Sequence, residues 1–280
     1  MGGDGTLNTA VVRSVVELVD VSKEYATADG MLRAIDQVSL EIGDGEFVSV
    51  LGPSGCGKST LMLIAAGLVA PTSGTVRVAG VAVQALYRDV GIVLQDATLY
   101  EWRRALENVL LPAQIQRLDP RRSRQRALEL LELVGLQGFE RKYPFELSGG
   151  MRQRVALCRA LVHDPKLLLM DEPFGALDAL SRDQMNLELQ HIWQTHRKTV
   201  LFITHSITEA VFLSDRVVVM SPRPGRIGAI LDIKLPRPRT FDFAETPEFG
   251  RYAREIRQIF ESWGVLHAAG RGALRATVSP

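Results

Sequence analysis

Residues 52–60 read GPSGCGKST and have the types and spacing of a loop that binds a phosphate chain. They follow a short, largely apolar stretch at residues 46–51 that is typical of a strand, and a helix is predicted at residues 59–67. In such a loop Lys58 reaches the β- and γ-phosphates, and the Ser59 hydroxyl binds Mg²⁺. A glycine-rich turn before a helix is the alternative, but Lys-Ser at this offset after a strand is hard to reach by chance. The predicted phosphate-binding residues are Gly52, Pro53, Ser54, Gly55, Cys56, Gly57, Lys58, Ser59 and Thr60.

A second stretch suited to an anion is the run LSGGMRQR at residues 147–154. Ser148, Gly149 and Gly150 precede a helix predicted at residues 151–162. Free N–H groups and the positive end of the helix dipole then meet at one exposed tip, which favours a bound phosphate. Taken alone, the run is explained equally well as an ordinary helix start with Ser148 as its N-cap.

Two carboxylates follow the purely apolar run LLLM at residues 167–170. Asp171 is expected to hold Mg²⁺, directly or through water, and Glu172 to polarise an attacking water. The alternative is a polar strand end without a chemical role. The phosphate loop at residues 52–60 favours the chemical interpretation, because phosphate transfer needs a metal ion and a positioned water.

Two polar side chains come directly after other predicted strands. Gln95 follows the strand at residues 90–94 and is expected to contact the attacking water or water on Mg²⁺, so the predicted metal-site residues are Ser59, Gln95 and Asp171. His205 follows a strand segment and is suited to hydrogen-bond the γ-phosphate and a catalytic carboxylate. The alternative for His205 is a cap of the helix predicted at residues 207–213.

Tyr25 and Asp178 each have two interpretations that local sequence leaves open. Tyr25, after the first predicted strand, is either a surface tyrosine or an aromatic ring that stacks on a nucleobase. Asp178, in Ala-Leu-Asp shortly after the carboxylate pair, either caps the following helix or contributes to the site.

Composition excludes several classes of protein. The chain has 280 residues and a net charge of +1, so no overall basic field indicates nucleic acid as a partner. Its apolar runs are shorter than the ~20 residues of a membrane helix, and its start does not resemble a secretory signal. Cys56 and Cys158 predict no disulfide framework, which fits a reducing cytoplasm. One interpretation of Cys56 is a thiol activated by helix-terminal N–H groups, but a small residue that fits the loop is the favoured interpretation.

The order of the predicted elements indicates an α/β fold. Strands are expected at residues 15–21, 34–42, 74–79, 90–94, 167–170, 199–203 and 216–220, and helices at residues 106–116, 123–134, 151–162, 180–195 and 207–213. The first strands alternate as antiparallel strands do, whereas the later strands alternate with helices and predict a parallel sheet covered on both faces. Ligands bind beyond the carboxyl ends of such strands, where residues 51 and 170 lead into the candidate groups.

With these motifs in order, the chain resembles the ATP-binding cassette (ABC) transporter ATPases over about residues 15–235. The resemblance implies a P-loop NTPase (RecA-like) core with an antiparallel β subdomain and an inserted α-helical subdomain at about residues 96–162. It divides the chain into a flexible N-terminus (1–13), an ATPase domain (14–235) and a C-terminal extension (236–280), with a helix at about 246–263 and then a disordered tail. Residues 52–60 then correspond to the Walker A loop and residues 147–151 to the signature. Gln95 corresponds to the Q-loop glutamine, Asp171 to the Walker B aspartate, Glu172 to the catalytic base, Asp178 to the D-loop, His205 to the switch histidine and Tyr25 to the adenine-stacking aromatic.

The resemblance also implies the cofactors and the assembly. ATP and Mg²⁺ bind between two cassettes that face head to tail, in a homodimer or a pair with a similar subunit. Ser148, Gly149 and Gly150 of one chain then clamp the nucleotide held by Lys58 of the other. Met151 stands where the commonest signature has Gln, so the clamp is expected to rely on Ser148 and backbone N–H groups.

A finer resemblance comes from SPRPGRI at residues 221–227, which is similar to an element of nitrate/sulfonate/taurine-type importer ATPases. Physically it is a Pro-Gly turn with two exposed arginines. The resemblance implies a peripheral ATPase at the cytoplasmic face of the inner membrane, with separate permease subunits and an extracytoplasmic solute-binding protein. The loop at residues 99–102 then receives the membrane subunit, with packing against the helical block as its alternative role. A soluble ABC ATPase without a transport role and a separate-chain exporter ATPase are the competing functions.

Overall fold

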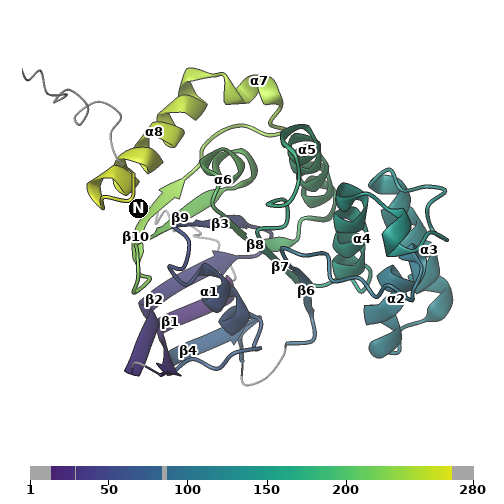
Figure 1. Ribbon diagram of the computed structural model, residues 1–280, viewed down its shortest axis with the longest axis horizontal. Coiled ribbons are helices and arrows are strands. Elements are labelled where there is room, and N and C mark those ends of the chain that lie inside the picture. Colours follow the sequence, from purple (N-terminus) through teal and green to yellow (C-terminus); the bar gives the residue numbers. More distant parts are fainter. Residues whose placement is uncertain (1–13, 29, 84–86, 267–280) are drawn as a thin grey trace, which may run out of the picture.

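Two β-sheets lie on either side of helix α1 (Lys58–Ala65) in the computed structural model, which describes residues 14–28, 30–83 and 87–266 (Figure 1). The smaller sheet is antiparallel, in the order β2-β1-β4-β5. Its strands are β1 (Ser14–Thr27), β2 (Gly30–Gly43), β4 (Ser73–Val78) and β5 (Val81–Ala82). The predicted flexible N-terminus (1–13) and most of the predicted disordered tail lie outside the described residues.

The larger sheet has the order β10-β9-β3-β8-β7-β6 and is parallel except for its edge strand β10. Its strands are β3 (Phe47–Leu51), β6 (Val90–Val93), β7 (Leu167–Asp171), β8 (Thr199–Thr204), β9 (Arg216–Met220) and β10 (Ile227–Asp232). Since helices separate the parallel strands in sequence, the carboxyl ends of β3, β7 and β8 meet at one edge. The predicted α/β class with its antiparallel subdomain is confirmed.

The continuous apolar strands serve two cores, one on each face of the larger sheet. In β7, Leu167 and Leu169 join the core shared with α1 and the antiparallel sheet. Leu168 and Met170 instead join the core under α5 (Ala179–His196) and α6 (Ile207–Leu213). This two-residue alternation explains why the strand has no polar face, because both of its faces are covered.

A helical block stands at one end of the molecule, on the side away from the antiparallel sheet (Figure 1). It consists of α2 (Ala105–Ile115), α3 (Pro120–Leu133), the short 3-10 helix η1 (Pro144–Glu146) and α4 (Gly149–Leu161). Helix α4 joins the block to the sheet, and a Cβ added to Gly91 of β6 would lie 2.2 Å from the carbonyl oxygen of Ala160. Only glycine permits this close approach of strand and helix.

The residues after β10 contribute side chains to the core of the larger sheet. Helix α7 (Phe241–Ala244) is followed by α8 (Pro247–Ser262), where the sequence predicts a helix at about 246–263. Phe249, Tyr252, Ile256 and Phe260 of α8 are buried in the same core as α6. Ahead of them Arg239 is 1% exposed, and its guanidinium donates to backbone carbonyls at the end of α6 and after β10. Burial lowers the pKa of Arg239 to about 10.

Candidate nucleotide-binding site

The loop at residues 52–60 connects β3 to α1, as the sequence predicts. Glycines are required at two of its positions because neighbouring atoms leave no room for a Cβ. Gly57, the residue before α1, has a φ of 104°, and a Cβ there would lie 2.8 Å from the carbonyl oxygen of Ala34. A Cβ on Gly52 would lie 2.7 Å from the Cys56 sulfur. The loop is therefore closely surrounded and leaves no room for further side chains at these positions. Its exposed backbone groups form a cradle that suits phosphate oxygens.

Lys58 is the charge at the base of this cradle. The residue is 5% exposed, and its ammonium donates to the carbonyl oxygens of Gly52 at 2.9 Å and Pro53 at 3.1 Å. An ammonium group has three donors, and the two carbonyls carry no negative charge to neutralise it. Among the described residues, the hydrogen bonds of this buried cation go to neutral oxygens only, which fits an anionic ligand.

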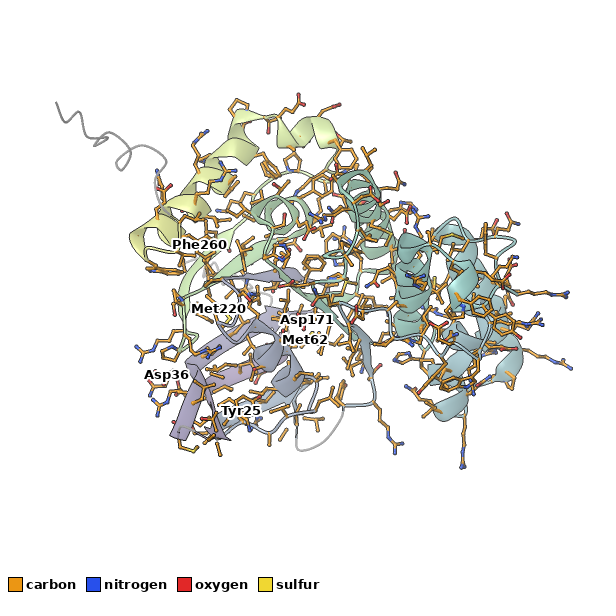
Figure 2. All side chains as sticks on the ribbon, in the orientation of Figure 1. Tyr25, Asp36, Met62, Asp171, Met220 and Phe260 are labelled. Atoms are coloured by element: carbon orange, nitrogen blue, oxygen red, sulfur yellow. The ribbon has the colours of Figure 1, made fainter. Side chains whose placement is uncertain are left out.

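Asp171 ends β7 close to the start of α1, and Figure 2 shows it near the centre of the molecule beside Met62 of that helix. Burial raises the pKa of Asp171 above its usual value. The neighbouring Glu172 charge also raises it, while the Ser59 hydroxyl and the Lys58 ammonium oppose the rise. A carboxylate and a hydroxyl thus stand together next to the phosphate cradle. These are hard oxygen ligands of the kind that Mg²⁺ takes.

The two oxygens suffice for magnesium only if phosphate completes the coordination. Among the described residues, no group of three His, Cys, Asp or Glu side chains is placed to hold a metal ion. Mg²⁺ is usually bound through one or two protein ligands plus substrate phosphates, so the donor set of Ser59 and Asp171 fits a metal that arrives with a nucleotide.

Glu172 has an unusual backbone conformation and a side-chain contact to His205. Its φ is 44°, a left-handed conformation that a glutamate rarely adopts, and its N–H donates to the carbonyl oxygen of Ile203 at 2.9 Å. The carboxylate Oε2 lies 3.1 Å from Nδ1 of His205, which follows the neighbouring strand β8. Backbone strain of this kind costs about 1–3 kcal/mol and is concentrated at functional sites. The structure thus brings the two side chains together at the sheet edge.

Gln95 lies in the loop after β6, close to the segment that follows Glu172. A Cβ on Gly175 would lie 3.7 Å from Nε2 of Gln95 and 3.4 Å from the carbonyl oxygen of Glu172. Gln95, Asp171, Glu172 and His205 therefore all stand at the carboxyl edge of the larger sheet, although they come from three separate strands.

Residues 148–150 do not join this cluster within the chain. Ser148 is the N-cap of α4, and its hydroxyl accepts from the N–H of Met151 at 3.3 Å. In the described part of the chain no hydrogen bond links residues 148–150 to residues 52–60. A Cβ on Gly150 would instead approach Leu177, just before Asp178, at 3.8 Å. The Met151 side chain packs against the core, and its N–H is already capped, so the N–H groups of Gly149 and Gly150 remain for a ligand.

Asp178 and Tyr25 make local contacts that leave both of their interpretations open. Asp178 is the N-cap of α5 and accepts from the N–H of Ser181 at 3.0 Å and from its hydroxyl at 2.7 Å. Backbone and hydroxyl hydrogen bonds from Ser181 lower the pKa of Asp178. Tyr25 lies on β1, away from Asp171 in Figure 2, with the ammonium of Lys23 5.1 Å from the ring centroid.

Comparison with known proteins places this geometry in a family. The model of the ABC transporter family matches residues 35–175. Over 247 residues the chain is 46% identical to the taurine import ATP-binding protein TauB of Rhizobium johnstonii, covering 85% of this chain and 93% of the relative. The chain belongs to the ABC transporter family. It is an ATP-binding subunit of that family and an ATPase.

Further relatives agree with this assignment. The aliphatic sulfonates import ATP-binding protein SsuB of Bacillus cereus is 38% identical over 254 residues, which cover 91% of this chain and 99% of that one. An uncharacterised ABC transporter ATP-binding protein of Methanocaldococcus jannaschii, MJ0412, is 44% identical over 246 residues, covering 88% and 91%. Two solved structures of the ABC cassette MJ0796 superpose on 79% of this chain and all of theirs. One is dimeric, with a TM-score of 0.71 and 34% identity, and one is in a post-hydrolysis state with ADP and Pi, with a TM-score of 0.70 and 33% identity.

The ABC site has a buried network that the sequence did not reveal. Glu209 of α6 is buried and bonds the hydroxyl of Thr204, which in turn accepts from the N–H of Ser206. The second carboxylate oxygen of Glu209 lies 3.6 Å from Nε of Arg182. The Arg182 guanidinium in turn donates to the carbonyls of Phe174 and Leu177. The network joins the segment before Asp178 to the residue before His205. The pairing of Arg182 with Glu209 depends on how α5 packs on α6, which carries no sequence signal.

A second group of hydrogen bonds, which the sequence does not indicate, ties α4 to the loop that contains Gln95. Gln153 donates to the carbonyl of Leu94 at 3.1 Å, and Arg159 donates to the carbonyls of Ala97 and Thr98 at 2.9 Å each. Both donors lie on the helix that begins with residues 148–150. These hydrogen bonds therefore join the loop that contains Gln95 to the helix that begins with residues 148–150.

Cys56 has no feature of a reactive thiol. It is buried and free, and burial raises the pKa of its thiol, with the nearby Lys58 charge opposing the rise only in part. The alternative of an activated thiol is wrong, because a raised pKa leaves less of the nucleophilic thiolate. Cys56 fills space under Gly52 instead.

Proposed function

We propose that the chain is the ATP-hydrolysing subunit of an ABC importer for a small solute such as taurine, a sulfonate or nitrate. It acts at the cytoplasmic face of the inner membrane with separate permease subunits and an extracytoplasmic solute-binding protein. The observation that carries the hydrolytic part is the pairing of Glu172 with His205 beside the phosphate loop. The import function is supported by relatives named as taurine and sulfonate import ATP-binding proteins. In the part of the chain that the structure describes, no helix combines the length and the apolar character of a membrane span.

Bound MgATP supplies the γ-phosphate that water attacks, and the side chains described above organise that attack. Glu172 orients the water and takes up its proton, while His205 holds the carboxylate in place and donates toward the γ-phosphate. Lys58 exchanges the carbonyls of Gly52 and Pro53 for phosphate oxygens, and this gives its charge a partner. Ser59, Asp171 and Gln95 face the metal and its water. Tyr25 stacks on the adenine, with Lys23 against its other face.

The site is completed by a second cassette. Among the described residues, residues 148–150 make no hydrogen bond to the phosphate loop, yet Gly149 and Gly150 present N–H groups at a helix start. A dimeric arrangement occurs in the related cassette MJ0796. In a head-to-tail pair, Ser148, Gly149 and Gly150 of one chain contact the nucleotide on Lys58 of its partner, and Asp178 lies beside the shared interface.

The permease docks over the groove between β6 and the helical block. This groove has a volume of about 1020 Å³ and is lined by Gly91, Tyr100, Ile115 and Arg159, among others. Trp102 stands next to it and is 72% exposed, with its ring tilted by 40° against that of Tyr100 at a centroid distance of 4.8 Å. The loop that carries this pair is held by the buried amide of Asn108. A rigid, exposed aromatic pair is a typical interface anchor, so these contacts favour docking over internal packing.

The test is reconstitution of the chain with a permease and a solute-binding protein encoded beside it. Proteoliposomes with MgATP on the cassette side should take up taurine, an alkanesulfonate or nitrate, and should stop doing so with Glu172→Gln. Robust hydrolysis by the isolated chain without any association with a permease would support a soluble ABC ATPase instead. Solute movement in the opposite direction would support the separate-chain exporter.

A further inference from the structure

The turn at residues 221–226, between β9 and β10, packs against the outside of the phosphate loop. Its backbone is fixed by the start of β2, since Gly225 donates to the carbonyl of Ala34 and accepts from the N–H of Asp36, each at 3.0 Å. Arg226 bonds the buried carboxylate of Asp36. The turn is therefore anchored to the antiparallel sheet before it reaches the phosphate loop.

Two successive carbonyl groups of the phosphate loop meet this turn. The carbonyl oxygen of Cys56 lies so close to Gly225 that a Cβ there would be 1.9 Å from it. The carbonyl oxygen of Gly55 accepts a hydrogen bond from Nε of Arg223 at 3.1 Å. Nη2 of Arg223 lies 3.0 Å from where a Cβ of Gly55 would be, so the guanidinium covers this residue. Arg223 itself is exposed on its outer side.

These contacts decide which way the loop's N–H groups point. In a trans peptide the C=O and the following N–H face opposite directions. Carbonyls of Gly55 and Cys56 held outward by the turn therefore direct the N–H groups of Cys56 and Gly57 inward. The N–H of Cys56 points across the loop, away from the turn, and in the absence of a ligand it donates to the carbonyl of Pro53 at 3.3 Å. Inward N–H groups are the donors that hold phosphate.

We propose that Arg223 is a positioning residue for nucleotide binding, which holds the Gly55 carbonyl outward and so presets the phosphate loop for a polyphosphate. Gly225 supports it by leaving room for the Cys56 carbonyl. The proposal rests on nucleotide binding by this loop and goes beyond the importer function. It gives the SPRPGRI turn a role in the ATP site, although the turn follows the strand β9, far from the phosphate loop in sequence.

The experiment is calorimetric titration of the full-length chain with MgADP and with MgATP. Arg223→Ala should raise both dissociation constants about tenfold, the effect of one charged hydrogen bond. Turnover at saturating MgATP should change by less than about threefold, because the reacting groups Glu172 and His205 are untouched. Arg223→Lys should restore binding in part, since lysine keeps the charge but lacks the guanidinium fork.

Matched controls separate this role from general effects of charge and folding. Arg257→Ala removes the same charge from the exposed side of α8 and should bind nucleotide as the wild type does. Gly225→Ala should weaken binding at least as much as Arg223→Ala, while Gly250→Ala, in α8, should not. Equal dissociation constants for Arg223→Ala and Arg257→Ala would overturn the proposal. Because binding needs no permease, a wrong importer assignment would leave the wild-type constant unaffected.

Discussion

Nδ1 of His205 lies 3.1 Å from Oε2 of Glu172, although 33 residues separate them in sequence. The two residues follow neighbouring parallel strands, and the register pairs Asp171 with Ile203. The residues after these two strands must therefore lie next to each other. This adjacency turns two isolated polar residues into a pair that can hold and polarise a water.

Glu172→Gln should lower steady-state ATP hydrolysis by about 10²–10⁴-fold, because an amide cannot take up the proton of the attacking water. ATP-driven dimerisation should persist, since the phosphate loop and signature are intact. Phosphate release and size-exclusion chromatography with MgATP measure the two properties. Turnover equal to that of the wild type would show that Glu172 is not the base.

Ser148 can be tested with two substitutions that separate its two roles. Asp caps helices as well as Ser does, so Ser148→Asp should retain the thermal midpoint. Its charge would face the γ-phosphate of the partner's nucleotide, so dimerisation of the Glu172→Gln protein and turnover of the otherwise wild-type protein should both be lost. Ser148→Ala should instead cost about 1 kcal/mol of stability. Wild-type turnover in Ser148→Asp would mean that Ser148 acts only as the cap of α4.

Glu209 makes stability depend on pH in a direction that burial dictates. Burial raises the pKa of this carboxyl above its ordinary 4.5, with the Thr204 hydrogen bond and Arg182 opposing the rise. The neutral carboxyl contributes fully to stability below pH 4.5, the ordinary pKa that it has in the unfolded chain. This contribution is lost as the pH rises through the raised pKa of the folded state. Glu209→Gln stays neutral, so its melting midpoint relative to wild type should increase between pH 4.5 and pH 8.

The matched control for this prediction is Glu132→Gln, on the exposed side of α3. Its midpoint relative to wild type should not follow the same trend. Turnover of Glu209→Gln should also fall, because Arg182 loses its charged partner and the segments before Asp178 and His205 are less firmly joined. A midpoint difference that is flat or that decreases with pH would contradict the burial argument.

Trp102→Ala should reduce transport-coupled ATPase activity more than basal activity. The ring is 72% exposed, so its removal should leave the fold intact and weaken only the permease contact, where an aromatic anchor is typically worth about 2 kcal/mol or more. Met31→Ala, which removes a side chain on the antiparallel sheet that is 66% exposed, is the control. Equal loss of both activities would mean that Trp102 serves packing instead.

Local features could be read from the sequence because each depends on few neighbouring residues. The phosphate loop needs glycines and Lys58 at set offsets, and the helices that begin after Ser148 and Asp178 carry their own capping side chains. The apolar run before Asp171 predicts a strand covered on both faces, and β7 is one. Each of these follows from backbone sterics and hydrogen bonding within a few residues.

Contacts between residues far apart in the chain leave no such pattern in the sequence. Arg182 and Glu209 meet only because α5 packs on α6, and Arg239 is buried only because the segment before α8 crosses the end of α6. The sequence by itself determined the motifs, the fold class and the chemistry that the motifs can perform. Tertiary structure alone decided which distant groups support them, among them Arg223 on the Gly55 carbonyl, because such contacts depend on how whole elements pack.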